Sequence, residues 1–251
     1  MKIIDFHTHV YPDRLADKAT QATCDFYGLC TDQTGTVEQL LQKGQAAGID
    51  RFVILPVSMR PERTRHINDF ILSQVAVQPR FLGFGTIHAG MENITEEVQY
   101  IMDKGLRGLK MHPDSQVFAI DDERLFPAYE MLQGKLPVIL HMGDKRYDYS
   151  HPARLRHVLE LFPKLQVIAA HFGGYTMHDV AAEELKEEFP DRTVRVVDSL
   201  GAGFGPGLLA CRAAELRNAG KSATEAGEIL DQEVKHLLQI FTVDDLNFLK
   251  R

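Results

Sequence analysis

Short apolar runs, β-branched in places, recur along the chain and alternate with stretches of helical periodicity. Each run ends at turn residues, and alternation of this kind predicts βαβ units and a parallel sheet. The predicted strands cover residues 2–6, 51–56, 81–87, 108–111, 137–141, 166–171, 194–198 and 238–243. Eight parallel strands close the common α/β barrel, so the predicted fold class is α/β, a TIM-like (βα)8 barrel.

Helical periodicity separates the predicted strands. The predicted helices cover residues 37–47, 95–104, 125–133, 152–162, 177–189, 207–218 and 224–237. Glycine follows several of them, where it is the expected C-cap, and Ser222 is the expected N-cap of the last helix. Too few residues follow the eighth strand for a final helix of ordinary length. Apolar barrel surface would then remain for a second copy to cover, and a homo-oligomer is an expectation.

Composition and charge restrict the class of protein. The chain has 251 residues, of which 44% are hydrophobic and 25% charged, an ordinary globular composition. The formal net charge of −7, without a Lys/Arg cluster longer than two, predicts no nucleic-acid partner. No run approaches the ~18 apolar residues of a membrane helix, and the first residues do not resemble a signal peptide. Three cysteines at irregular spacing fit a reducing cytoplasm.

Two histidines directly follow the first predicted strand, at His7 and His9. Residues i and i+2 of a strand point the same way, so both imidazoles could converge on one ion. They would do so at the C-terminal mouth of the barrel, where active sites of this fold lie. The alternative is a pair of surface histidines at a strand end.

Two further histidines close apolar strands and lead into glycine-containing loops, at His141 and His171. Neutral imidazoles with one carboxylate, and a position left for water, form the ligand set of catalytic zinc. Such an ion lowers the pKa of bound water towards ~7 and polarises a carbonyl group. A histidine beside the metal ligands can then move the proton.

Residues 1 to about 178 resemble the amidohydrolase superfamily, in the branch that holds mononuclear-zinc hydrolases and related decarboxylases. The motifs that carry the resemblance lie at residues 4–9, 105–113, 137–144 and 170–174. The resemblance implies that His7, His9 and His141 bind a metal, and that His171 is a ligand or the general acid/base. It also implies an Asp at the end of strand eight, usually within a Gly-Ser-Asp-Phe-Pro segment, which is absent here.

Residues from about 181 onward resemble a middle fragment of the DegV family of fatty-acid-binding proteins. The matching segments are residues 181–185, 189–190, 196–200, 205, 207–209, 220–222 and 241–246. The Ser/Thr-rich loop that binds the lipid carboxylate and a later Gly-Gly-Arg segment are missing. Gly203 stands where the resemblance places a serine. The chain is therefore predicted to be one chimeric barrel domain, residues 1–251. Its first six strand–helix units come from residues 1–180 and two from residues 181–251.

Four further residues complete the predicted site. Asp244 falls where the amidohydrolase pattern places its strand-eight Asp and could bind metal or orient water, although helix N-capping is the competing role. Lys110 is assigned to substrate binding, with a salt bridge or a carboxylated bridging lysine as alternatives. His112 is assigned to substrate binding or to a loop role. Asp144 is assigned to substrate binding or to fixing a histidine tautomer.

The leading hypothesis is therefore a metal-dependent hydrolase with a divalent ion, Zn²⁺ before Mn²⁺ or Fe²⁺. It would act on an amide, lactone or ester carbonyl of a small-molecule substrate, or catalyse a related decarboxylation. His171 and Asp244 would be the catalytic residues. Two alternatives are a folded but inactive hybrid, natural or engineered, and a fatty-acid-binding protein of DegV type.

Overall fold

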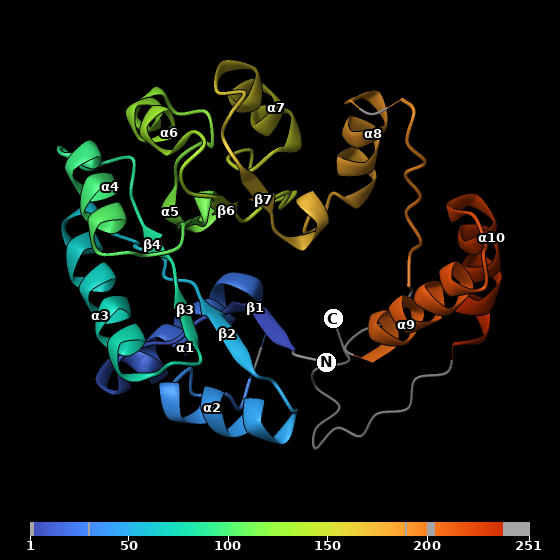
Figure 1. Ribbon diagram of the computed structural model, residues 1–251, viewed down its shortest axis with the longest axis horizontal. Helices are drawn as coiled ribbons and strands as arrows, with labels where there is room; N and C mark the ends of the chain where they lie inside the picture. Colours follow the sequence, from blue (N-terminus) through green and yellow to red (C-terminus); the bar gives the residue numbers. More distant parts are fainter. Residues whose placement is uncertain (1–2, 30, 189, 200–203, 238–251) are drawn as a thin grey trace. The chain divides into compact units, whose positions relative to one another are not determined.

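Alternating strands and helices are present in the computed structural model, which describes residues 3–29, 31–188, 190–199 and 204–237 (Figure 1). Contacts within the chain divide it into two compact units, Met1–Ala181 and Ala182–Arg251. The single chimeric barrel over residues 1–251 stays a prediction.

Seven short strands of the first unit form two parallel sheets. They are β1 Ile4–Thr8, β2 Arg51–Ile54, β3 Phe81–Gly83, β4 Gly85–Thr86, β5 Leu109–Met111, β6 Val138–Leu140 and β7 Val167–Ala169. One sheet has the order β1-β2-β3 and the other the order β4-β5-β6-β7. Every pairing is parallel and follows chain order, as in a TIM-like barrel. Six predicted strands are confirmed, the third being divided at Phe84.

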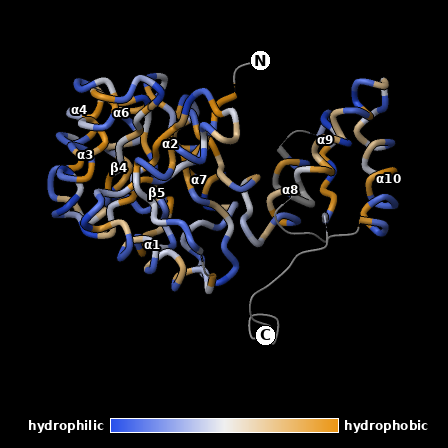
Figure 2. The backbone as a smooth tube through the Cα atoms, turned by 90° about the horizontal axis from the view of Figure 1, so that it is seen from below, coloured by the Kyte–Doolittle hydropathy of each residue, from blue (hydrophilic) through white to orange (hydrophobic). Residues whose placement is uncertain are grey.

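Helices connect these strands. They are α1 Asp13–Tyr27, α2 Val37–Ala46, α3 Thr64–Val77, α4 Ile94–Asp103, α5 Pro113–Gln116, α6 Phe126–Leu132, α7 Pro152–Leu161 and α8 His178–Glu188, with 3-10 turns η1 Pro61–Arg63, η2 Glu123–Leu125 and η3 His171–Gly173. Figure 1 shows α2, α3, α4, α6 and α7 outside the strands, in chain order. Figure 2 shows the alternation of hydrophilic and hydrophobic stretches along α3 and α4. Helices α1, α3 and α5 were not predicted from the sequence.

Apolar side chains cover both faces of the strands. Phe52 and Ile54 of β2 belong to a large buried cluster that includes residues of the outer helices. Val53 and Leu55 belong instead to a second, smaller cluster with Phe84 and residues of β6 and β7. Alternate residues of one strand therefore enter different cores, as expected for a parallel sheet buried on both faces. The smaller cluster marks the inner face of the curved sheets.

Glycines end several helices in the predicted way. Gly105 follows α4 with φ of 77°, and Gly134 follows α6 with φ of 68°. This left-handed region is open to glycine at little steric cost, whereas a residue with a Cβ is strained there. The helix boundaries that were read from these glycines agree with the structure to within one or two residues.

The second unit is helical where the structure describes it. It contains α8 from residue 182 onward, α9 Phe204–Asn218, α10 Ala223–Glu233 and the 3-10 turn η4 Val234–His236. Ser222 caps α10 as predicted: its hydroxyl accepts from the backbone N–H of Glu225, whose carboxylate accepts from the N–H of Ser222. The strand predicted at residues 194–198 is wrong. These residues form no strand and pair with no described strand, and β-branched residues adopt a strand only where a partner is available. The eighth predicted strand, residues 238–243, lies outside the described residues.

Two smaller expectations concern the cell compartment. Cys24 is buried and Cys211 exposed, and neither forms a disulfide, while Cys30 lies outside the described residues. Within the described part of the chain, no helix has both the length and the apolar character to cross a bilayer. A cytoplasmic location stays a prediction.

Candidate functional site

Strand alternation aims Lys110, His112 and His141 at the inner face of the sheets. Leu109 and Met111 of β5 belong to the large buried cluster on the outer face of the sheets, which we call the outer core. Lys110 and His112 alternate with them along the strand and therefore point to the inner face. Ile139 of β6 belongs to the smaller cluster on the inner face, which we call the inner core. His141, two residues further along the chain, therefore points inward as well. All three side chains are buried.

His7 and His9 share one face of β1, as predicted, and their ring centroids lie 5.2 Å apart. Residues 4 and 6 of the same strand are exposed on its other face. The His9 Nδ1 atom lies 2.6 Å from the carbonyl oxygen of Leu55 and donates to it when the ring is neutral. This hydrogen bond fixes the tautomer and leaves the lone pair of Nε2 available for a metal ion or a substrate.

A left-handed turn places His171. In a straight continuation of β7, His171 would share the outward face of Val167 and Ala169, which pack against the outer core. The backbone instead has positive φ at three consecutive residues, 57° at His171, 58° at Phe172 and 74° at Gly173. Positive φ is strained for residues with a Cβ, and such strain concentrates at functional positions. The turn carries the His171 ring to within 5.1 Å of His7 and 4.7 Å of His141.

The five strand-end histidines thus form one continuous series of ring contacts, which we call the histidine cluster. Its members are His9, His7, His171, His141 and His112 in order of contact. The predicted residues His7, His9, His141 and His171 are all in it. Four different strand ends contribute, although these residues are up to 164 positions apart in the sequence (171 − 7).

Burial and the neighbouring Lys110 keep the histidine cluster neutral. Desolvation lowers the pKa of His7 to about 2, of His112 to about 3, and of His9 and His171 to about 4. Burial also lowers the pKa of His141 far below its usual range. The pKa of Lys110 falls to about 7 because its amine is buried. Neutral imidazoles are the form that binds a metal ion or accepts a proton.

Three buried polar atoms beside these rings lack a hydrogen-bond partner among the described residues: Lys110 Nζ, His141 Nε2 and Asp114 Oδ1. The other oxygen of Asp114 accepts a 2.6 Å hydrogen bond from the Ser150 hydroxyl and lies 3.9 Å from His141 Nε2. Desolvation raises the pKa of Asp114 to about 6. Buried polar atoms without partners are rare and point to a bound group or a chemical role.

Asp114 also belongs to a group that could hold a metal ion. The ligand atoms of His112, Asp114 and His141 all lie within 4.8 Å of one another. His7 and His9 are outside this group, so of the predicted ligands only His141 belongs to it. Asp114 was not predicted as a site residue, although it stands two residues after the strand-end His112, a position that could have indicated it.

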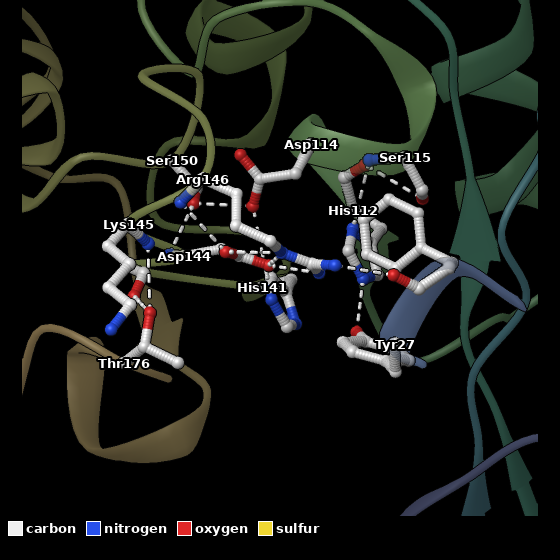
Figure 3. A network of polar contacts seen from close by, with 12 residues as sticks. Tyr27, His112, Asp114, Ser115, His141, Asp144, Lys145, Arg146, Ser150 and Thr176 are labelled. Carbon is white, nitrogen blue, oxygen red and sulfur yellow. Dashed lines mark hydrogen bonds and ion pairs between the residues drawn. The ribbon is translucent and has the colours of Figure 1, made fainter. Parts of the chain in front are cut away.

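The end of α1 covers the buried side of the cluster (Figure 3). The Tyr27 hydroxyl lies 2.7 Å from His112 Nε2. Arg146 holds this end in place, since its guanidinium donates to the Phe26 carbonyl oxygen and lies 4.7 Å from the Phe26 ring centroid. Asp144 in turn accepts three hydrogen bonds from the Arg146 side chain. The contacts of Asp144 therefore favour a positioning role, and its assignment to substrate binding stays a prediction.

The structure also bears on the roles predicted for His112 and Lys110, but not on those predicted for Asp244. His112 caps α5, where its Nδ1 accepts from the backbone N–H of Ser115 at 3.3 Å, and its Nε2 faces Tyr27. The salt bridge considered for Lys110 is absent among the described residues. Asp244 lies outside the described residues, and its roles as metal ligand and catalytic residue stay predictions. No local motif marked Tyr27, which reaches the site through the unpredicted helix α1.

Comparison with curated proteins finds relatives that carry the DegV name. A DegV domain-containing protein of Clostridium perfringens is 39% identical over 134 residues, 53% of this chain and 46% of that protein. The DegV domain-containing protein YteA of Lactococcus lactis is 42% identical over 79 residues, 32% of this chain and 27% of that protein. These partial matches support the DegV-like segment. The chain spans less than half the length of either relative.

Comparison with solved structures finds a decarboxylase and a hydrolase at low identity. A 2,6-dihydroxybenzoate decarboxylase is 19% identical, with a TM-score of 0.47 over 66% of this chain and 65% of that one. A Pseudomonas putida protein described as a 2-pyrone-4,6-dicarboxylic acid hydrolase is 18% identical, with a TM-score of 0.48 over 92% and 78%. Similarity at this level says nothing about the reaction of this chain.

The comparison with family models covers most of the chain. The amidohydrolase model matches residues 4–228, beginning in β1 and including every member of the histidine cluster. It extends about 50 residues beyond the segment in which the sequence motifs were recognised (228 − 178). The strand order, the strand-end histidines and this match agree, and the chain belongs to the amidohydrolase family.

Proposed function

We propose that this chain is a metal-dependent hydrolase whose reaction takes place at the histidine cluster. The observation that carries the proposal is the convergence of five neutral imidazoles from four strand ends, beside buried atoms without partners. The substrate class we propose is a small molecule with an amide, lactone or ester carbonyl. A related decarboxylation at the same site is the closest alternative reaction.

The proposed metal ligands are His7, His9 and His141, with Asp244 as the carboxylate. The donor set fits, because His9 keeps its Nε2 lone pair free and His141 Nε2 has no hydrogen-bond partner among the described residues. Imidazole ligands favour Zn²⁺, with Mn²⁺ and Fe²⁺ as alternatives. When bound, a divalent ion supplies Lewis acidity towards a carbonyl oxygen and activates water.

The group formed by His112, Asp114 and His141 is a less favourable ligand set. The rings of His112 and His141 are stacked at 3.8 Å with an angle of 9° between their planes. Lone pairs of imidazole lie in the ring plane, so two parallel rings cannot both direct one at an ion about 2.1 Å away. Both nitrogens of His112 also have hydrogen-bond partners already. We therefore assign His112 to the substrate side of the site.

His171 is the proposed general acid/base. It is the exposed member of the histidine cluster, so substrate and water can reach it, and its lowered pKa makes it a proton acceptor at neutral pH. Lys110, with a pKa of about 7, can donate a hydrogen bond to a substrate oxygen from a site that excludes water. Asp144, through Arg146 and Phe26, holds Tyr27 over this region.

Two other functions remain as competing proposals. Fatty-acid binding of DegV type has the support of the partial DegV matches. An inactive hybrid has the support of the second unit, in which residues 194–198 do not form the predicted seventh strand. A misplaced strand seven or eight would shift the loops that shape the substrate pocket, and catalysis tolerates little misplacement.

Metal content of the purified, dialysed chain, measured together with turnover, tests the hydrolase proposal against the inactive hybrid. We expect elemental mass spectrometry to find about one Zn²⁺, Mn²⁺ or Fe²⁺ per chain, lost in a His7→Ala/His9→Ala variant. A matched His157→Ala/His236→Ala variant removes two exposed histidines outside the cluster and should keep the ion. Metal with turnover of esters, lactones or amides supports the hydrolase. Metal without turnover of these or of carboxylated aromatic acids supports the inactive hybrid, and failure to bind any ion rejects the metal-dependent mechanism.

A further inference from the structure

An apolar groove that no member of the histidine cluster lines is formed by residues of α1, α3 and the loop after β2 in the first unit. Its volume is about 1150 Å³, more than the ~300–1000 Å³ of ordinary small-molecule sites. Its apolar walls include Leu15, Ala19 and Ala22 of α1, Val57 and Met59 of the loop after β2, and Phe70 of α3.

Two large apolar side chains of this groove face solvent. Leu15 is 46% exposed and Met59 is 56% exposed, although both line the same groove. Scattered exposed apolar residues are ordinary, but several that line one concave surface indicate a binding site. The walls therefore offer an apolar ligand a surface that the described chain leaves open.

Four cations surround these apolar walls: Arg14, Lys18, Arg60 and Arg63. None of them forms an ion pair with another described residue. The one acidic residue among those that line the groove, Asp69, accepts a 2.6 Å hydrogen bond from the Tyr100 hydroxyl. It forms no ion pair with any of the four cations among the described residues. The chain as a whole carries a net charge of −7, so a concentration of unpaired cations at one groove stands out.

We propose that this groove binds an amphipathic anion, an acyl chain that ends in a carboxylate or phosphate. The apolar part would lie along Leu15, Met59 and Phe70, where burial of apolar surface stabilises the complex. The anionic end would lie at Arg60 and Arg63, whose guanidinium groups form charge-assisted, two-pronged hydrogen bonds with such groups. The ligand matches the groove in both apolar character and charge, and the proposal does not depend on the metal site.

Calorimetric titration with decanoate, below its micelle concentration, tests the proposal. Decanol is the uncharged probe with the same chain, and butyrate is the short probe with the same charge. We expect decanoate to bind at least about tenfold more tightly than decanol, because a hydrogen-bonded charge is worth about that factor. Butyrate should show no binding in the same range. Equal affinity for decanol, or no decanoate binding, would overturn the proposal.

Variants place the ligand in this groove rather than elsewhere on the chain. Arg60→Gln/Arg63→Gln should weaken decanoate binding about tenfold or more and leave decanol unchanged. Met59→Gln should weaken both probes. The control variants Arg107→Gln and Val77→Gln change an exposed arginine and an exposed apolar residue away from the groove, and should change neither affinity. Decanoate binding that survives in both groove variants would mean a different site, such as the DegV-like segment, and would overturn the proposal.

Two other occupants of the groove give distinguishable results. Sedimentation of the chain with phosphatidylglycerol vesicles, without binding of monomeric decanoate, would indicate adsorption to a lipid surface. A dimer in the absence of any amphiphile, abolished by Met59→Gln, would indicate that a second copy covers the groove. Either result would overturn the proposed small-molecule site. A monomeric chain with a one-to-one decanoate stoichiometry supports it.

Discussion

The two sides of the histidine cluster are built differently. On the side of β5 and β6, Lys110, His112 and His141 are buried, and strand alternation alone directs them inward. On the side of β1 and β7, His7 is only partly buried and His171 is exposed, and a strained left-handed turn is required to direct His171. The comparison teaches that the buried side is held by packing and the open side by backbone conformation.

The buried side should show the largest effect, in the pH dependence of stability. The pKa of Lys110 falls from 10.5 in the unfolded chain to about 7 in the folded protein, so the unfolded state binds more protons between these values. Metal-free protein should therefore gain several kcal/mol of unfolding free energy between pH 7 and about 10. Lys110→Met should remove this gain, as measured by urea unfolding at several pH values.

A matched control and a second pH window complete this test. Lys135→Met replaces an exposed lysine and should keep the full pH dependence. Below pH 6.5, the lowered pKa values of His9 and His171 predict a loss of stability as pH falls towards about 4. Lys110→Met should keep this loss in weaker form, because burial remains the main cause of the lowered pKa values while the charge of Lys110 is removed. A wild-type stability that stays level from pH 7 to 10 would contradict the burial of an unpaired amine.

The close approach of the loops after β6 and β7 should show the second-largest effect, on the free energy of unfolding and on metal retention. Gly143, in the loop after β6, has φ of 69°, and a Cβ there would lie 2.4 Å from the Cα atom of Gly174. Gly143→Ala should therefore lower the unfolding free energy by about 3 kcal/mol and reduce metal retention, because the loops after β6 and β7 must separate.

Gly105→Ala is the control for Gly143→Ala, since Gly105 has φ of 77° and nothing within 4 Å of an added Cβ. It should cost only the conformational penalty of about 1 kcal/mol and leave metal content unchanged. The measurement is urea unfolding with elemental analysis of both variants. Equal losses of unfolding free energy in the two variants would mean that the close approach of the two loops does not constrain residue 143.

Relief of backbone strain at Val117 and at Phe172 should give the smallest change in the free energy of unfolding. Val117 ends α5 with φ of 60° and is 66% exposed, so Val117→Asn should raise the unfolding free energy by about 1 kcal/mol. Phe172→Asn on the open side should stabilise the chain less, because its ring covers some surface, and should keep the turn and therefore the metal. Loss of metal in Phe172→Asn would show that the Phe172 ring, rather than the turn, positions His171.

The sequence predicted the features that depend on local pattern. The first six strands followed from their apolar runs, several helix ends from their glycines, and His7, His9, His141 and His171 from their positions at strand ends. Helix α1 was missed because it is polar on average and buries only two small residues, Ala16 and Cys24, so no apolar run marks it in the sequence. The predicted strand at residues 194–198 failed because pairing is a tertiary property.

Other parts of the site could not be predicted from a local pattern. The contact of Tyr27 with His112 joins residues 85 positions apart, and the turn that redirects His171 has no glycine at the first two of its three residues. Asp114 became a candidate only when the fold placed it beside His141 and Ser150. Sequence reasoning therefore identified the histidines but not the side chains that hold or cover them.

The outward side chains of β1 have a consequence for handling the protein. Ile4 and Phe6 stand on the same face of the strand and are 48% and 49% exposed. Exposed apolar side chains that share one surface favour association with the apolar surfaces of other chains. Concentrated solutions should therefore become turbid at a rate that rises steeply with protein concentration. A charged residue at position 4 or 6 should slow this association without reaching the histidine cluster.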